Sequence, residues 1–185
     1  TPGASVIVTF GVAKIAVNAD ANGRWLATLP AMAANTNSQT LSVTDGRETK
    51  AISDVLVGDV WLCSGQSNMK FKVKQSVGGR EEIASASDPH LRLLNMIGGK
   101  ATAGTDFDAK AIANLQPEQF YTGSWQECSP NTVPEFSSVA YLVGKKLRET
   151  QNVPVGLICN AVGGSPAAAW LPEEVIRSRP EYAGF

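Results

Sequence analysis

The fold is decided by the stretch from Val55 to Cys63, which reads Val-Leu-Val-Gly-Asp-Val-Trp-Leu-Cys and is apolar except at Gly58-Asp59. An apolar run of this kind is typical of a central parallel strand that is buried on both faces. A second such run extends from Val153 to Cys159. We therefore predict that the two runs are adjacent parallel strands of an α/β fold.

A helix is predicted between these two runs, from Phe136 to Gln151, because apolar residues recur there at helical spacing with charged residues outward. The apolar positions are Val139, Leu142, Val143 and Leu147; the charged ones are Lys145, Lys146, Arg148 and Glu149. A helix followed by a strand is the unit from which α/β folds are built. A last helix is expected to start near Ser165-Pro166 and to run through Trp170 and Val175. Residues 97–118 are expected to be a surface loop or insertion.

The first 53 residues have a different pattern, in which apolar and polar residues alternate. Alternation over four to six residues favours half-buried antiparallel strands, and Asn22-Gly23 and Asp45-Gly46 are typical turn sequences. The alternating apolar residues are Val6, Val8, Phe10, Ile15, Val17, Trp25, Ala27, Leu29, Leu41 and Val43. The prediction is a small β-sandwich-like region over residues 1–53, followed by an α/β domain over 54–185.

Composition excludes several functions. The 185 residues carry a formal net charge of −1, so no electrostatic footprint for nucleic acid or an anionic membrane is expected. No apolar run approaches the roughly 18 residues that a membrane span needs. His90 is the one histidine, and the three cysteines form no Cys-x-x-Cys pair, which argues against a multi-histidine metal site and a zinc ribbon. We expect no metal or organic cofactor.

Candidate catalytic groups follow the first apolar run, in Ser64-Gly65-Gln66-Ser67-Asn68-Met69. A serine on a tight turn from strand to helix exposes its hydroxyl, and its own N–H can help to bind an oxyanion. The alternative for Ser67 is that it only caps the next helix. The second run ends similarly, at Gly163-Gly164, whose N–H groups suit an oxyanion donor; the alternative is that these glycines serve turn geometry alone.

Several stretches closely resemble the sialate O-acetylesterase family, a carbohydrate-esterase branch of the SGNH (GDSL-type) hydrolases. The resemblance is carried by residues 54–69, by Trp125 to Pro130, by Phe136 to Tyr141, by Val153 to Ile158 and by Gly163 to Trp170, in the order of the family. It implies a flavodoxin-like parallel sheet and a serine O-acetylesterase acting on O-acetylated sugars, of the sialic acid or plant-polysaccharide type. It also implies an extracytoplasmic location.

The resemblance assigns roles to a few residues. Ser67 matches the nucleophile, the N–H of Ser67 matches one oxyanion donor, and Gly163 or Gly164 matches a second. The neighbouring Gln66 and Asn68 are expected to support the site. Lys70 departs from the family, which often has an acidic residue there.

Two family blocks have no counterpart in this sequence: an oxyanion-hole Asn or Asp, and an Asp-x-x-His that carries the base. His90 lies in a stretch that is not a catalytic block, so we expect it to be a turn or strand-edge residue. We therefore expect a second polypeptide, or a C-terminal fragment of the same precursor, to complete the sheet and supply these groups. The alternative is a non-catalytic carbohydrate-binding protein with a degenerate hydrolase half.

Overall fold

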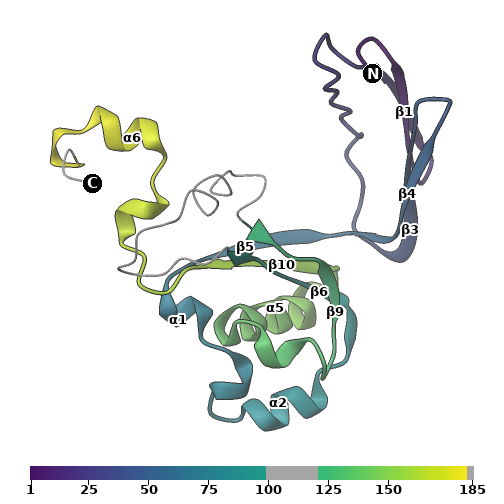
Figure 1. The fold of residues 1–185 in the computed structure, drawn as a ribbon. Coiled ribbons are helices and arrows are strands. Elements are labelled where there is room, and N and C mark those ends of the chain that lie inside the picture. The colour runs from purple at the N-terminus through teal and green to yellow at the C-terminus, as the bar shows by residue number, and fades with distance from the viewer. Residues whose placement is uncertain (99–120, 183–185) are drawn as a thin grey trace. The chain divides into compact units, whose positions relative to one another are not determined.

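The computed structural model of the chain describes residues 1–98 and 121–182 (Figure 1). The chain divides into two compact units, Thr1–Asp59 and Val60–Phe185. This division falls six residues after the change of pattern at 53, since the last strand of the first unit continues to Val57. The predicted loop over 97–118 lies, from residue 99 onward, outside the described residues.

The N-terminal unit contains one four-stranded antiparallel sheet, in the order β2-β1-β3-β4. Val6, Val8 and Phe10 alternate along the central strand β1 and are 3–5% exposed, as their spacing predicted. The hairpin at Asp45-Gly46 is confirmed by the pairing of β3 with β4. The strands are β1 (Ser5–Phe10), β2 (Ala13–Asn18), β3 (Asn35–Thr44) and β4 (Thr49–Val57).

A strand predicted around Trp25 and Leu29 was wrong. Residues 24–34 have no strand pairing, although Ala27 and Leu29 are half-buried and the residues beside them are exposed. The alternation therefore reflects an extended segment without ladder hydrogen bonds. The unit accordingly has one sheet in its described residues rather than the two packed sheets of a sandwich.

The second unit is built on a sheet in the order β5-β10-β6-β9. Strands β6 and β10 are parallel, from Leu91 opposite Val155 to Asn95 opposite Cys159, and β9 runs antiparallel to β6 at the edge. The strands of this sheet are β5 (Asp59–Gly65), β6 (Asp88–Asn95), β9 (Trp125–Cys128) and β10 (Val155–Ala161). The sheet thus mixes a parallel centre with an antiparallel edge. A separate two-stranded sheet is formed by β7 (Ile97–Gly98) and β8 (Tyr121–Thr122).

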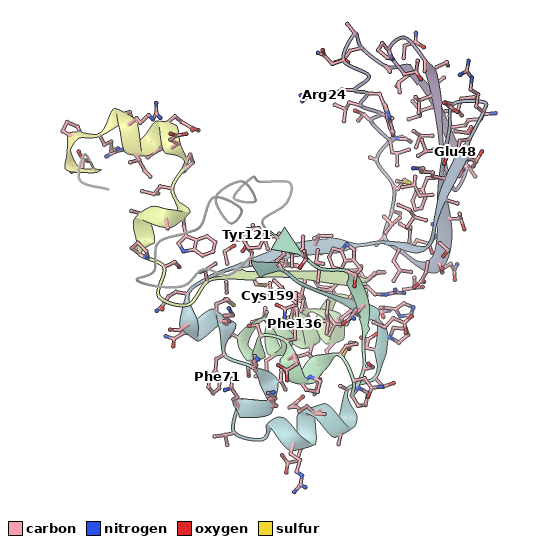
Figure 2. The ribbon with its side chains drawn as sticks, in the orientation of Figure 1. Arg24, Glu48, Phe71, Tyr121, Phe136 and Cys159 are labelled. Carbon is pink, nitrogen blue, oxygen red and sulfur yellow. The ribbon has the colours of Figure 1, made fainter. Side chains whose placement is uncertain are left out.

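Three helices, α1, α2 and α5, lie on one side of this sheet (Figure 1). The core forms between the sheet and α5, and Phe136 and Cys159, both labelled in Figure 2, belong to it. The helices are α1 (Ser67–Lys70), α2 (Gly79–Ser85), α5 (Ser138–Gln151) and α6 (Glu173–Ser178). Short 3-10 turns occupy Val73–Gln75, Val133–Glu135, Ala167–Trp170 and Pro180–Tyr182. The last helix predicted from Ser165 is thus split into two pieces, which Leu171 and Pro172 separate.

The helix predicted over Phe136–Gln151 is confirmed, but its buried face was predicted wrongly. Val139, Leu142 and Val143 are 46–50% exposed, whereas Ala140, Tyr141 and Gly144 are buried. Gly144 lies so close to β10 that a Cβ there would stand 2.5 Å from the Leu157 side chain. Small residues therefore let α5 pack tightly on the sheet, which a pattern of large apolar residues does not predict.

The run Val55–Cys63 was expected to be one strand buried on both faces, and this was also wrong. Val57 ends β4, and β5 begins after Gly58 in the other sheet. Strand β5 lies at the edge of its sheet, with Val60 62% and Leu62 65% exposed. A Cβ on Gly156 would contact both Val60 and Trp125, so these side chains share the face that α5 does not cover.

Candidate active site

The site lies where β5 and β10 end side by side. The N–H of Val162, just after β10, donates a hydrogen bond of 3.0 Å to the carbonyl oxygen of Gly65, the last residue of β5. Both strands therefore end at the same edge, as the predicted parallel pairing requires. In open α/β sheets, ligands bind at the carboxyl ends of the strands. This contact brings the segment from Gln66 to Met69 beside the loop from Val162 to Ser165.

Ser67 is the first residue of α1 and is exposed. The turn that presents it depends on Gly65, whose φ of 151° is rarely adopted by residues with a side chain. A Cβ on Gly65 would also lie 3.2 Å from the Cβ of Met69. Glycine is therefore needed to pass from β5 into the helix that carries Ser67.

The short helix α1 is anchored to the core behind it. Met69 packs partly buried against the core, and the hydroxyl of Ser137 donates to its sulfur at 3.5 Å. The N–H of Ser138 donates to the carbonyl oxygen of Phe71 at 2.8 Å. Ser137 is also the N-cap of α5, where its hydroxyl accepts from the Ala140 N–H. The helix that carries Ser67 is thus held by Ser137 and Ser138, the residues at which α5 starts.

The hydroxyl and the N–H of Ser67 share one partner. The side-chain oxygen of Gln66 accepts from the Ser67 N–H at 2.9 Å and from the Ser67 hydroxyl at 2.7 Å. Because a backbone N–H can only donate, the oxygen and not the nitrogen of the Gln66 amide must face it. Asn68, the other residue expected to support the site, is exposed and has no side-chain hydrogen bond within the described residues.

The second loop presents its two glycines openly. Gly164 has a φ of 80°, in the left-handed region that favours glycine, and a Cβ on Gly163 or Gly164 would meet nothing within 4 Å. The loop is closed by Ser165, whose N–H and hydroxyl both donate to the carbonyl oxygen of Val162, while the hydroxyl accepts from Trp170. Ser165 therefore tightens the turn rather than capping the helix that the sequence predicted. A ligand can approach the backbone of both glycines.

The cysteines near this edge are poor nucleophiles. Burial raises the pKa of Cys159 to about 11, and burial also raises the pKa of Cys63. The reactive form of a cysteine is the thiolate, and a raised pKa removes it at neutral pH. Among the nucleophiles at the ends of β5 and β10, Ser67 is the one that is both exposed and placed on a turn.

His90 lies at the other end of the strands from Ser67. It precedes Leu91, which is opposite Val155 at the start of β10, whereas Gly65 bonds to Val162 at its end. At about 3.3 Å per residue, this separates His90 from the Ser67 edge by roughly 20 Å. Its contacts are with Asp88 and Arg148, and the Arg148 guanidinium also donates to the carboxylate of Asp88 at 3.0 Å. The geometry places His90 outside the site.

Sequence reasoning missed Asn160. Its side-chain oxygen, two residues before Val162 at the end of β10, is buried and has no hydrogen-bond partner among the described residues. The signal in the sequence was a single amide within the otherwise apolar stretch from Val155 to Ala161.

In residues 1–98 and 121–182, no group of three His, Cys, Asp or Glu residues could hold a metal ion. Nor is any helix there long and apolar enough to cross a membrane.

Comparison with known proteins defines the class first. No protein-family model matches the chain. The fold is similar to that of a carbohydrate acetylesterase from Xanthomonas citri, with a TM-score of 0.79 and 31% sequence identity over 96% of this chain and 38% of that one. The chain thus has the fold of part of a carbohydrate acetylesterase.

The curated relatives narrow the class to one family. The human sialate O-acetylesterase is 32% identical over 128 residues, which is 66% of this chain and 23% of the human protein. The rat sialate O-acetylesterase is 30% identical over 142 residues, 76% of this chain and 25% of the rat protein. The chain belongs to the sialate O-acetylesterase family. It spans about a quarter of the length of these relatives.

Proposed function

We propose that this chain carries the nucleophile and two oxyanion donors of a serine O-acetylesterase that removes acetyl groups from O-acetylated sugars. The observation that carries the proposal is the junction of Gly65 with Val162, which sets the turn of Ser67 beside the loop of Gly163 and Gly164. This is the arrangement that acyl transfer needs, with a hydroxyl and backbone N–H donors at one place. The names of the relatives supply the acetylated carbohydrate as substrate class.

The reaction begins with Ser67 as nucleophile. Its oxygen forms a bond to the carbonyl carbon of the acetyl group, and its proton passes to a general base. The negative charge that develops on the acetyl oxygen is held by the Ser67 N–H together with that of Gly163 or Gly164.

The acetyl group then leaves the sugar. The bond from the carbonyl carbon to the sugar oxygen breaks, the proton returns to that oxygen, and an acetyl-serine remains. Water, losing its proton to the base, attacks the acetyl-serine and releases acetate with Ser67 restored. No step in this sequence calls for a metal or an organic cofactor.

In this proposal, the general base lies outside these 185 residues. His90 is on the wrong edge of the sheet, and a serine hydroxyl without an adjacent base is a weak nucleophile. We propose that an Asp-x-x-His segment and an Asn or Asp donor, of the SGNH type, complete the site and a flavodoxin-like sheet beyond β5. An extracytoplasmic location is part of the same proposal. The named relatives are enzymes, so the non-catalytic alternative is not favoured.

The test is acetate release from O-acetylated saccharides by the full-length protein and by two serine variants. Ser67→Ala is expected to abolish release while the folded structure, followed by circular dichroism, is unchanged. Ser85→Ala is the matched control, because the Ser85 hydroxyl donates to the carbonyl oxygen of Glu82 at the end of α2, its one hydrogen bond within the described residues. Ser67→Ala turnover within tenfold of the wild-type rate would refute the proposal.

A further inference from the structure

One oxygen atom accepts hydrogen bonds from both the N–H and the hydroxyl of Ser67. The Gln66 side-chain oxygen lies 2.9 Å from the Ser67 nitrogen, within the range of about 2.7–3.1 Å at which a donor holds an oxyanion. The same oxygen accepts the Ser67 hydroxyl proton at 2.7 Å, a proton that a general base must receive during acyl transfer. Gln66 thus engages the oxyanion donor and the nucleophile at once.

We propose that the Gln66 side chain is a built-in occupant of the oxyanion position at Ser67, and that the acetyl oxygen of a substrate must displace it before the serine can react. The inference rests on the function proposed above. An amide oxygen resembles the carbonyl oxygen of an acetyl ester in size and as a hydrogen-bond acceptor. The glutamine therefore imitates the substrate and holds the site in a resting state.

The surroundings of Gln66 allow it to leave. Gln66 is exposed, and its side chain makes no hydrogen bond other than these two within the described part of the chain. Its backbone, by contrast, is fixed, since its carbonyl oxygen accepts from the N–H of Lys70 in the first turn of α1. A rotation of the side chain alone would free the Ser67 N–H and hydroxyl without moving the turn.

The opposite role makes the opposite prediction. If Gln66 held Ser67 in a reactive orientation, its removal would slow every reaction of the serine. If Gln66 occupies the position of the acetyl oxygen, an incoming group must break the two Ser67–Gln66 hydrogen bonds before it can react. Removal of the Gln66 side-chain oxygen takes away this cost. Reactions of Ser67 should then become faster.

The experiment measures the second-order rate constant for labelling of Ser67 by a small fluorophosphonate, using the full-length protein and intact mass. Circular dichroism gives the folded fraction of each variant, and the rate constant is divided by this fraction, so a partly unfolded variant remains informative. Gln66→Met keeps the length of the side chain and removes the acceptor oxygen. It is expected to raise the rate constant by at least about threefold, since even one of the two hydrogen bonds, at a typical net strength, implies a factor of about three to ten. An unchanged or lower rate constant would overturn the proposal.

Two further variants sharpen the result. Gln75→Met is the matched control, because the Gln75 side chain accepts from the N–H of Lys72 at 3.2 Å, away from Ser67; its rate constant should equal the wild-type value. Gln66→Glu places a charged acceptor at the same position, and charged acceptors bind such donors more strongly. Its rate constant relative to wild type should fall at neutral pH and recover as the pH drops toward about 4.3, where the carboxylate is protonated. A ratio independent of pH would count against the proposal.

The same measurement separates this inference from the proposed function. If the wild-type protein is not labelled at Ser67, the proposed nucleophile is wrong. If Ser67 is labelled but Gln66→Met does not accelerate labelling, the nucleophile stands and the displacement by substrate is wrong.

Discussion

The N–H of Val162 donates to the carbonyl oxygen of Gly65 at 3.0 Å, and this contact joins the ends of two strands that lie almost one hundred residues apart in the sequence. Behind it, β5 and β10 run in the same direction, and ahead of it the chain turns twice at the same edge. Each turn contains a glycine with positive φ, Gly65 in the first and Gly164 in the second. The geometry of the candidate site depends on these two turns.

The stability of the protein should be more sensitive to substitution at Gly164 than at the neighbouring Gly163. Gly164→Ala is expected to lower the free energy of unfolding by about 1–2 kcal/mol, because a side chain at positive φ is strained. Gly163→Ala is the matched control, with open space at its Cβ and no positive φ, and should change stability by less than about 0.5 kcal/mol. Equilibrium denaturation of the full-length protein measures both. Equal losses for the two variants would contradict the turn described here.

The close packing of α5 on β10 gives a second stability prediction. Gly144→Val should lower the free energy of unfolding by about 1–3 kcal/mol, because a Cβ at this position would overlap the buried side chain of Leu157. Lys146→Val introduces the same residue on the same helix where the side chain is 73% exposed. Helix propensity alone would make Gly144→Val the more stable of the two variants, because valine is a better helix former than glycine and a poorer one than lysine. If the two variants are equally stable, Gly144 is not the close contact.

His90→Ala should leave ester hydrolysis by the full-length protein within about threefold of the wild-type rate. The reason is its position at the start of β6, at the edge of the sheet away from Ser67. Removal of a general base typically costs 10²–10⁴-fold in rate. A hundredfold loss of kcat, with the fold intact, would make His90 the base and require a different arrangement of the sheet.

The thiols give a prediction that depends on pH. Burial raises the pKa of Cys128 and of Cys159 to about 11, so alkylation of the folded protein at pH 8 should modify the half-buried Cys63 first. A raised thiol pKa in the folded state means that its contribution to stability is present below about pH 9 and is lost as the pH rises toward 11. Peptide mapping after timed alkylation and urea unfolding at several pH values check the two statements. Equal alkylation rates for the three thiols would contradict the first statement, and a free energy of unfolding that does not fall as the pH rises from about 9 toward 11 would contradict the second.

Sequence patterns located the main elements of the second unit. The apolar runs predicted that β5 and β10 are neighbours, and the spacing from Phe136 to Gln151 predicted α5. The break at Gly58 was not predicted, because apolar residues continue across it while the chain passes from one sheet to the other. The buried face of α5 was not predicted either, since the tight approach at Gly144 depends on tertiary packing.

The candidate site shows the same limit. The turn sequences placed Ser67, Gly163 and Gly164 at strand ends, and the structure brings those ends together, while the catalytic roles of these residues stay predictions. Gln66 was expected only to support the site. That its side-chain oxygen binds the Ser67 N–H and hydroxyl depends on backbone angles at the start of α1, which no sequence pattern specifies.

The central claim is that Ser67 forms a covalent acetyl-enzyme, and its most direct test is to trap that species. The full-length protein would be mixed with an O-acetylated saccharide, quenched in acid within milliseconds, digested and analysed by mass spectrometry. The account predicts an acetyl group on Ser67, in the peptide that contains Gln66 and Asn68, which disappears in Ser67→Ala. An acetyl group on another residue, with Ser67→Ala still forming it at the wild-type rate, would contradict the account.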